Sequence, residues 1–173
     1  GDVVSGIYAG GPMYYGADYS IDELRESGFT NLIIWTIHIN EDGDLNFNAE
    51  FPIVEDGVYV GDSSYPNFPS DVALLKTEPT TIKRIEFGLS AWGSSTFDHI
   101  QDLVNAEGTG KDSILYQNFA ALKAEIPDID AMNFDDESTY DVSTATQFAI
   151  MLADLGYKVA LVPYTQVTFW QNL

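Results

Sequence analysis

Three polar side chains alternate with apolar ones in segment 130–137, which reads Asp-Ala-Met-Asn-Phe-Asp-Asp-Glu. Asn133, Asp135 and Glu137 stand at every second position, so in a β-strand they share one face, with the two carboxyl groups about 7 Å apart. Neighbouring carboxyl groups raise one another's pKa, and one of them can then stay protonated near neutral pH. The pair is suited to acid–base chemistry, and we expect Glu137 to donate the proton with Asp135 as its partner.

Two plainer interpretations of the same pattern remain open, namely a solvated acidic strand end and a Ca²⁺ site. A strand buried on both faces of a parallel sheet is ordinarily apolar throughout, so its alternate polar residues need an explanation. Met132 and Phe134 are expected to point the other way, towards covering helices.

Strand-like and helix-like patterns alternate along the chain. We predict strands at residues 3–8, 31–39, 82–90, 129–134 and 157–163. Helices are predicted over 20–28, after the candidate caps Ser95 and Asp112, and over 142–155. Residues 40–80 form a long connection with a hairpin that turns at Asp56-Gly57 and a short helix near Leu74 and Leu75. This order predicts an α/β fold with a parallel sheet, because parallel neighbours need crossover connections, and it fits a doubly wound sheet or a barrel.

Composition limits the class of function. The 173 residues suffice for one domain, 1–173, and include 27 acidic against 7 basic residues, a formal net charge of -20. Such a charge repels phosphate backbones and anionic lipid, so neither nucleic acid nor a membrane is expected as a partner. The absence of cysteine excludes disulfides and thiolate chemistry. No signal peptide is recognisable, and we expect a mature secreted form.

The carboxylate segment resembles the catalytic-strand signature of glycoside hydrolase family 18, D-x-x-D-x-D-x-E, with Asp130, Asn133, Asp135 and Glu137 at the four positions. Its Phe-Asp-Asp-Glu form is more similar to the endo-β-N-acetylglucosaminidase branch than to common chitinases. Segment 85–93 resembles the family's third-strand motif, and segment 29–45 resembles its second strand and the following turn.

This resemblance implies a (β/α) TIM-type barrel and a retaining, substrate-assisted hydrolysis of β-1,4-linked N-acetylglucosamine, in an N-glycan core or a chitin-like polymer. Glu137 would act as acid and base, while Asp135 would orient the substrate's 2-acetamido group. No metal or organic cofactor is implied. Asn133, Asp130 and Ser90 would support the two acids. The predicted place of Ser90 on the interior face fits a hydrogen bond to Asp130 or Asn133, and equally a buried hydroxyl bonded to the backbone.

Two departures from the family pattern leave other functions open. Asn133 replaces an aspartate that normally shares charge beneath Asp135, and an amide cannot ionise. The chain also offers about five βα units, truncated after the fifth strand, where a closed barrel has about eight strands. A fragment, a barrel completed by a second polypeptide and a self-associating half barrel are all compatible with this length. A catalytically silent, lectin-like glycan binder is the alternative function.

Aromatic and polar residues in the loops after the predicted strands are candidates to line the sugar site: Tyr15, Trp92, Tyr164, Gln166 and Trp170. For Tyr15 and Trp92, ordinary packing of an amphipathic ring is an equally open interpretation. Trp35, inside a strand, is instead predicted to pack in the core. We interpret His38 as a hydrogen-bonded strand-end residue and His99 as a surface residue of a helix.

Overall fold

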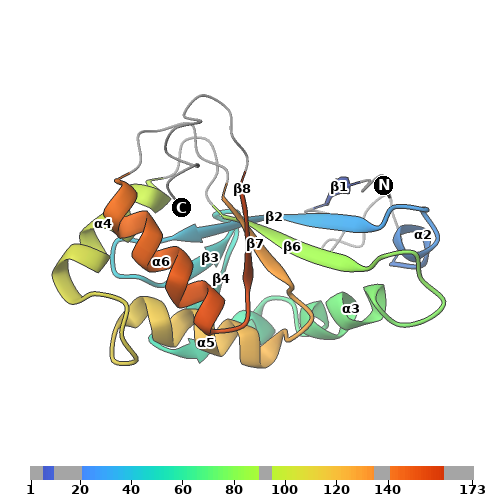
Figure 1. The fold of residues 1–173 in the computed structure, drawn as a ribbon. Helices are drawn as coiled ribbons and strands as arrows, with labels where there is room; N and C mark the ends of the chain where they lie inside the picture. Colours follow the sequence, from blue (N-terminus) through green and yellow to red (C-terminus); the bar gives the residue numbers. More distant parts are fainter. Residues whose placement is uncertain (1–5, 10–20, 90–94, 135–140, 162–173) are drawn as a thin grey trace.

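The structure is a computed structural model that describes residues 6–9, 21–89, 95–134 and 141–161, with only the backbone described for 6–9 and 161. The strands of these residues form one sheet (Figure 1). They are β1 (Gly6–Ala9), β2 (Asn31–Ile39), β3 (Leu45–Phe47), β4 (Phe51–Glu55), β5 (Val58–Tyr59), β6 (Arg84–Leu89), β7 (Ala131–Phe134) and β8 (Lys158–Leu161).

The parallel part of the sheet has the order β1-β2-β6-β7-β8. It confirms the parallel sheet predicted from the alternation of strands and helices. β2 has the predicted bounds, 31–39, because its run Leu-Ile-Ile-Trp-Thr-Ile is rich in residues that favour strands. β6 and β7 are shorter than their predicted strands.

The region between β2 and β6 is more ordered than the long connection that we predicted. The expected hairpin is present, since β4 pairs with β5 and Asp56 and Gly57 at its turn have φ angles of 48° and 78°. β3, which pairs antiparallel with both β2 and β4, was not predicted. Three residues, Leu-Asn-Phe, are too short a run to be recognised by alternation.

Four helices lie below and to the left of the strands in Figure 1: α3 (Phe68–Leu75), α4 (Thr96–Glu107), α5 (Ile114–Glu125) and α6 (Val142–Asp154). The short α2 (Ile21–Arg25) and the 3-10 helix η1 (Gly61–Ser63) complete the described helices. The predicted cap Asp112 is wrong, because the Ser113 hydroxyl accepts the Tyr116 N–H and begins α5. Ser95 does precede α4, but its side chain makes no capping hydrogen bond.

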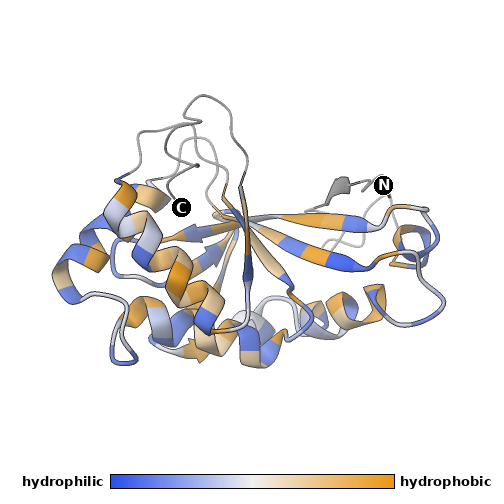
Figure 2. Ribbon diagram, viewed as in Figure 1, coloured by the Kyte–Doolittle hydropathy of each residue, from blue (hydrophilic) through white to orange (hydrophobic). Residues whose placement is uncertain are grey.

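The main core lies between the sheet and these helices. Phe134 of β7 packs against Phe97 of α4 and Phe148 of α6, at ring-centroid distances of 5.4 and 5.7 Å. Phe87 of β6 meets Phe68 of α3 at 6.1 Å. Met132 and Phe134 are fully buried, as predicted for residues that face the helices. In Figure 2 orange and blue segments alternate along the helices, as expected of helices with one apolar and one polar side.

Candidate functional site

The face of the parallel strands turned away from α3–α6, here called the inner face, carries an unusual row of residues. Phe87 and Leu89 are buried among the helices, so Gly88 between them belongs to the inner face. A Cβ atom at Gly88 would lie 2.3 Å from Cε3 of Trp35. The indole of β2 therefore covers the space that glycine leaves empty on β6. Gly88 is also the register partner of Asn133 on β7, so Trp35, Gly88 and Asn133 form one row, the inner row.

Asn133 is the polar member of the inner row. Its side chain is on the inner face, opposite to Met132 and Phe134, and the residue is only 5% exposed. Within the described part of the chain, its Oδ1 has no hydrogen-bond partner. A buried carbonyl oxygen without a donor is costly, and such an atom in a native fold asks for an explanation.

β7 ends one residue after Asn133, at Phe134. The predicted catalytic pair, Asp135 and Glu137, follows directly in the sequence and lies outside the described residues. Six other predicted site residues also lie outside the described residues: Ser90, Tyr15, Trp92, Tyr164, Gln166 and Trp170. The carboxyl ends of parallel strands are where βα folds carry their chemistry, so the end of β7 remains the candidate active site.

Asp130 is placed at the opposite, amino-terminal end of β7. Its carboxylate accepts the backbone N–H of Ile85 at 2.8 Å and forms an ion pair of 2.5 Å with Lys76, the residue after α3. These contacts hold β6, β7 and the end of α3 together. The predicted hydrogen bond from Ser90 to Asp130 or Asn133 involves a residue outside the described ranges and stays a prediction. Asp130 thus stands apart from Asn133 and contacts the scaffold.

The inner face also carries a buried polar cluster that was not predicted. Glu86 is 3% exposed, accepts a hydrogen bond of 2.6 Å from Asn31 Nδ2 and lies 3.5 Å from Arg84. Asn31 Oδ1 and Arg84 Nε are themselves buried without partners among the described residues. The signal was present in the sequence, since Arg84 and Glu86 alternate with apolar residues as Asn133 does.

Both histidines and Trp35 differ from their predicted settings. His38 has a buried Nε2 without a partner in the described ranges, and burial lowers its pKa, so that the neutral imidazole is favoured. His99 is partly buried rather than superficial, and its Nδ1 lies 2.7 Å from the Ile39 carbonyl oxygen. Trp35 is half-buried and is not part of the hydrophobic core.

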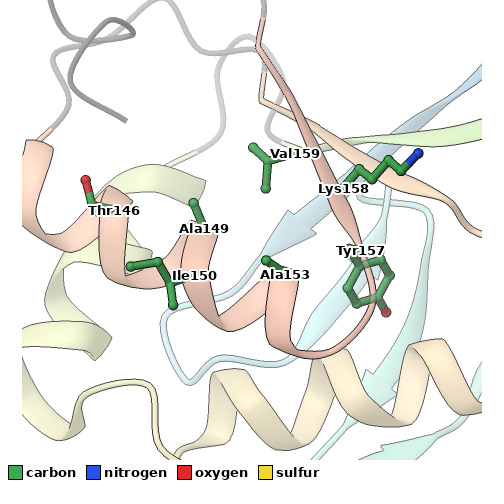
Figure 3. Close-up of a pocket in the computed structure, with 7 residues that line it drawn as sticks. All are labelled: Thr146, Ala149, Ile150, Ala153, Tyr157, Lys158 and Val159. Atoms are coloured by element: carbon green, nitrogen blue, oxygen red, sulfur yellow. The ribbon is translucent and has the colours of Figure 1, made fainter.

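A separate apolar hollow of about 540 Å³ lies between α6 and β8. In Figure 3 the side chain of Val159 points towards Ala149 of α6, whereas Lys158 points away from the helix. Val159 therefore belongs to the helix-covered face, and the hollow is on the opposite side of the sheet from the inner row. We call it the α6–β8 groove and assign it no part in the candidate active site.

Metal and membrane features are missing from the ranges that the structure describes. They contain no group of three or more His, Asp or Glu residues arranged to hold a metal ion. Nor does any helix within them combine the length and apolarity that crossing a bilayer demands.

Comparison with known proteins gives a match in structure alone. No protein-family model and no curated protein matches the chain. A variant of the GH18 chitinase of Cycas revoluta, solved with (GlcNAc)4, superimposes with a TM-score of 0.54 at 10% identity and covers 88% of the chain. The group IV chitinase of Ostrinia furnacalis, solved with allosamidin, superimposes with a TM-score of 0.57 at 14% identity and covers 92% of the chain. The spore cortex-lytic enzyme SleL of Bacillus cereus superimposes with a TM-score of 0.52 at 12% identity and covers 90% of the chain.

The fold is that of part of a family 18 barrel. The matched regions make up 39%, 43% and 34% of those three structures, so the chain spans about two fifths of their length. The parallel strands β1, β2, β6, β7 and β8 thus form an incomplete barrel, as the number of predicted strands indicated. In this family 18 fold, the inner face is the face that a complete barrel encloses.

Proposed function

We propose that the chain is part of a glycoside hydrolase that cleaves β-1,4-linked N-acetylglucosamine. One observation carries the proposal: the family 18 fold comes with an Asp-x-Glu pair immediately after β7. A structural neighbour with this fold is a chitinase solved with (GlcNAc)4, which gives the substrate class. The form Phe-Asp-Asp-Glu favours an endo-β-N-acetylglucosaminidase that acts on the N-glycan core over a chitinase.

The proposed mechanism is retaining and substrate-assisted, one of the exceptions to the two-carboxylate scheme. Glu137 donates its proton to the glycosidic oxygen while the carbonyl oxygen of the substrate's own 2-acetamido group attacks the anomeric carbon. The leaving sugar departs as an alcohol, and an oxazolinium ion forms. Asp135 orients the acetamido group and stabilises its positive charge. The Glu137 carboxylate then takes a proton from water, which opens the oxazolinium ring and regenerates the acid.

The test uses a high-mannose N-glycopeptide and (GlcNAc)4 as substrates, with product masses measured by mass spectrometry. We expect cleavage between the two core N-acetylglucosamines. Because Glu137→Gln removes the transferable proton and keeps the shape, that variant should lose at least about a hundredfold in rate while it retains glycan binding. Cleavage that persists at the unmodified rate in the Gln variant would assign the acid to another residue.

A lectin-like glycan binder is the second candidate, and Asn133 favours it. The amide at this buried inner position cannot take up or release a proton, so the charge coupling to Asp135 that the family signature implies is absent. Binding of (GlcNAc)4 without turnover of either substrate would support this function. The absence of binding and turnover would contradict both.

We further propose that the protein acts outside the cell, where its N-acetylglucosamine-containing substrates occur as polymers and glycoproteins. The strongly acidic composition, with a net charge of -20, supports a soluble protein that avoids polyanions. A second polypeptide or a second copy is the proposed partner at the open edge of the sheet.

A further inference from the structure

The few basic residues of this acidic chain are gathered at one end of the sheet. Of the 7 Lys and Arg residues, all but Lys111 lie in the segments that lead into β2, β6, β7 and β8: Arg25, Lys76, Lys83, Arg84, Lys123 and Lys158. Parallel strands begin at the same edge of a sheet, so these side chains share one end of the fold, here called the amino end.

Contacts at the amino end agree with this placement. The ion pairs of the described residues are all found there: Arg25–Asp22, Lys76–Asp130, Lys83–Glu78 and Arg84–Glu86. Lys123 Nζ donates to the Ile129 carbonyl oxygen, just before β7, and Lys158 is the first residue of β8. The cations therefore neutralise carboxylates or bind the backbone where the strands begin.

The opposite, carboxyl end of the parallel strands carries acids without such partners. In the described ranges these are Glu41, Asp42 and Asp44 after β2, Asp98 in the first turn of α4 and Asp141 before α6. None of them belongs to an ion pair of the described residues. Hydrogen bonds from Thr144 lower the pKa of Asp141, which favours its charged form.

The sequence extends this separation of charge to the other connections. The residues that directly follow β1, β2, β6, β7 and β8, up to the next helix or strand, include no Lys or Arg. Those after β7 add Asp135, Asp136 and Glu137 to the acids of the carboxyl end. Because the carboxyl ends of the strands are where βα folds carry their chemistry, a substrate approaches this fold at its most negative end.

A surface of one sign of charge acts on ligands over distances longer than a contact. It repels ligands of the same sign, lowers their local concentration and slows their association by factors of about 10 or more at low salt. A neutral sugar experiences no such repulsion. The bond to be cleaved can be the same in both ligands, so the difference depends on charged groups elsewhere in the glycan.

Resting on the proposed function, we infer that the site selects neutral glycans and discriminates against glycans that carry carboxylate or phosphate groups. The basis is the placement of the charges and not the net charge alone. A phosphorylated or sialylated N-glycan with an unchanged N-acetylglucosamine core is then a poor substrate, because its anionic groups must enter the field of the carboxyl end.

The experiment compares two substrates that differ in charge: a high-mannose N-glycopeptide and the same glycopeptide with phosphate on its outer mannose residues. At about 0.05 M NaCl, kcat/KM for the phosphorylated form should be at least about tenfold lower than for the neutral form. At about 0.5 M NaCl the ratio should fall to about threefold or less, since salt screens the repulsion. If the chain binds without turnover, the same ratios are measured as Kd by titration calorimetry.

Two double variants with the same net charge separate placement from total charge. Glu41→Lys with Asp98→Lys reverses two charges at the carboxyl end, and Glu26→Lys with Asp154→Lys reverses two at the amino end. All four side chains are exposed, and melting temperatures check that both variants fold. The carboxyl-end variant should reduce the low-salt discrimination at least about fivefold, whereas the amino-end variant should leave it within about twofold of the unmodified chain.

The outcomes distinguish the inference from the proposed function. Equal use of both glycopeptides at low salt, or an equal effect of the two double variants, overturns the inference and leaves the proposed function standing. A chain that neither binds nor cleaves the neutral glycopeptide or (GlcNAc)4 overturns both.

Discussion

At the scale of single residues, the inner row depends on a pair of complementary sizes. Gly88 has no side chain, whereas tryptophan has the largest side chain of the amino acids. The indole of Trp35 fills the space over Gly88. Thr36 adds a hydrogen bond of 2.9 Å from its Oγ1 to the Gly88 carbonyl oxygen, which fixes β2 and β6 in register at this point. The effects of substitutions at positions 35 and 88 on the free energy of unfolding are therefore expected to be non-additive.

Gly88→Ala should lower the free energy of unfolding by about 1–3 kcal/mol, because the new methyl group would overlap the indole of Trp35. Urea denaturation of the single and double variants tests this. In a Trp35→Leu background the smaller side chain leaves room, so the same substitution should cost markedly less. Gly110→Ala is the control, since no atom lies within 4 Å of its Cβ position. Equal costs in both backgrounds would show that the two residues do not interact.

Single residues are predictable from the sequence where their setting depends on near neighbours in the chain. The alternation of Asn133 with Met132 and Phe134 predicts its face correctly, because the strand period is local. The half-buried setting of Trp35 depends on which residue the neighbouring strand places opposite, and strand register is not visible in a sequence without turns to fix it. The same holds for His99, whose partner is the carbonyl oxygen of Ile39, 60 residues away.

At the scale of elements, Asp130 belongs to the segment that resembles the catalytic-strand signature, yet its contacts connect elements of the fold. β6 begins beside it, since its carboxylate accepts the Ile85 N–H, while its own backbone N–H donates to the Ile85 carbonyl oxygen. The ion pair with Lys76 joins the end of α3 to the same corner. The side chain thus anchors three elements at the end of the sheet that lies away from the candidate active site.

Asp130→Ala should lower the free energy of unfolding by about 1–3 kcal/mol, because it leaves the Ile85 N–H without its side-chain acceptor. Asp130→Asn keeps an acceptor and loses only a partly exposed ion pair, so it should cost about 1 kcal/mol or less. Denaturant titration gives both values, and glycan turnover should stay within about twofold of the unmodified chain. A variant with unchanged stability and abolished turnover would place Asp130 in the active site instead.

The elements themselves were predictable to different degrees for a physical reason. β2 and α6 carry long periodic patterns, and their predicted bounds agree with the structure to within one residue. The antiparallel extension β3-β4-β5 is held by contacts distant in sequence. Asn118 of α5 accepts a hydrogen bond from the Gly57 N–H and donates one to the Gly43 carbonyl oxygen. The sequence around each residue does not predict these bonds, because their partners are 61 and 75 residues apart. Short strands fixed by such tertiary contacts escape pattern analysis.

At the scale of the whole molecule, β8 is the last strand of the sheet among the described residues, and the α6–β8 groove runs beside it. Ala149 and Ala153 give the groove a shallow floor, and Ile150 next to them is 57% exposed. An open strand edge beside an apolar surface favours association with another strand and its helix. Among the described strands β1 pairs only with β2, and it runs in the same direction as β8, so a second copy of the chain offers it as a partner for that strand.

We expect the 173-residue chain to self-associate through this edge, with β8 of one copy against β1 of the next. The net charge of -20 opposes association, so the weight-average mass should exceed 19.1 kDa mainly at raised salt, where repulsion is screened. Sedimentation equilibrium at 0.05 and about 0.5 M NaCl measures this. Ile150→Asp puts a charge in the groove and should return the mass to that of one chain. Leu74→Asp, at a 42% exposed position on α3, should leave association unchanged. A single-chain mass at both salt concentrations would exclude this pairing and leave the edge of β8 to a different polypeptide.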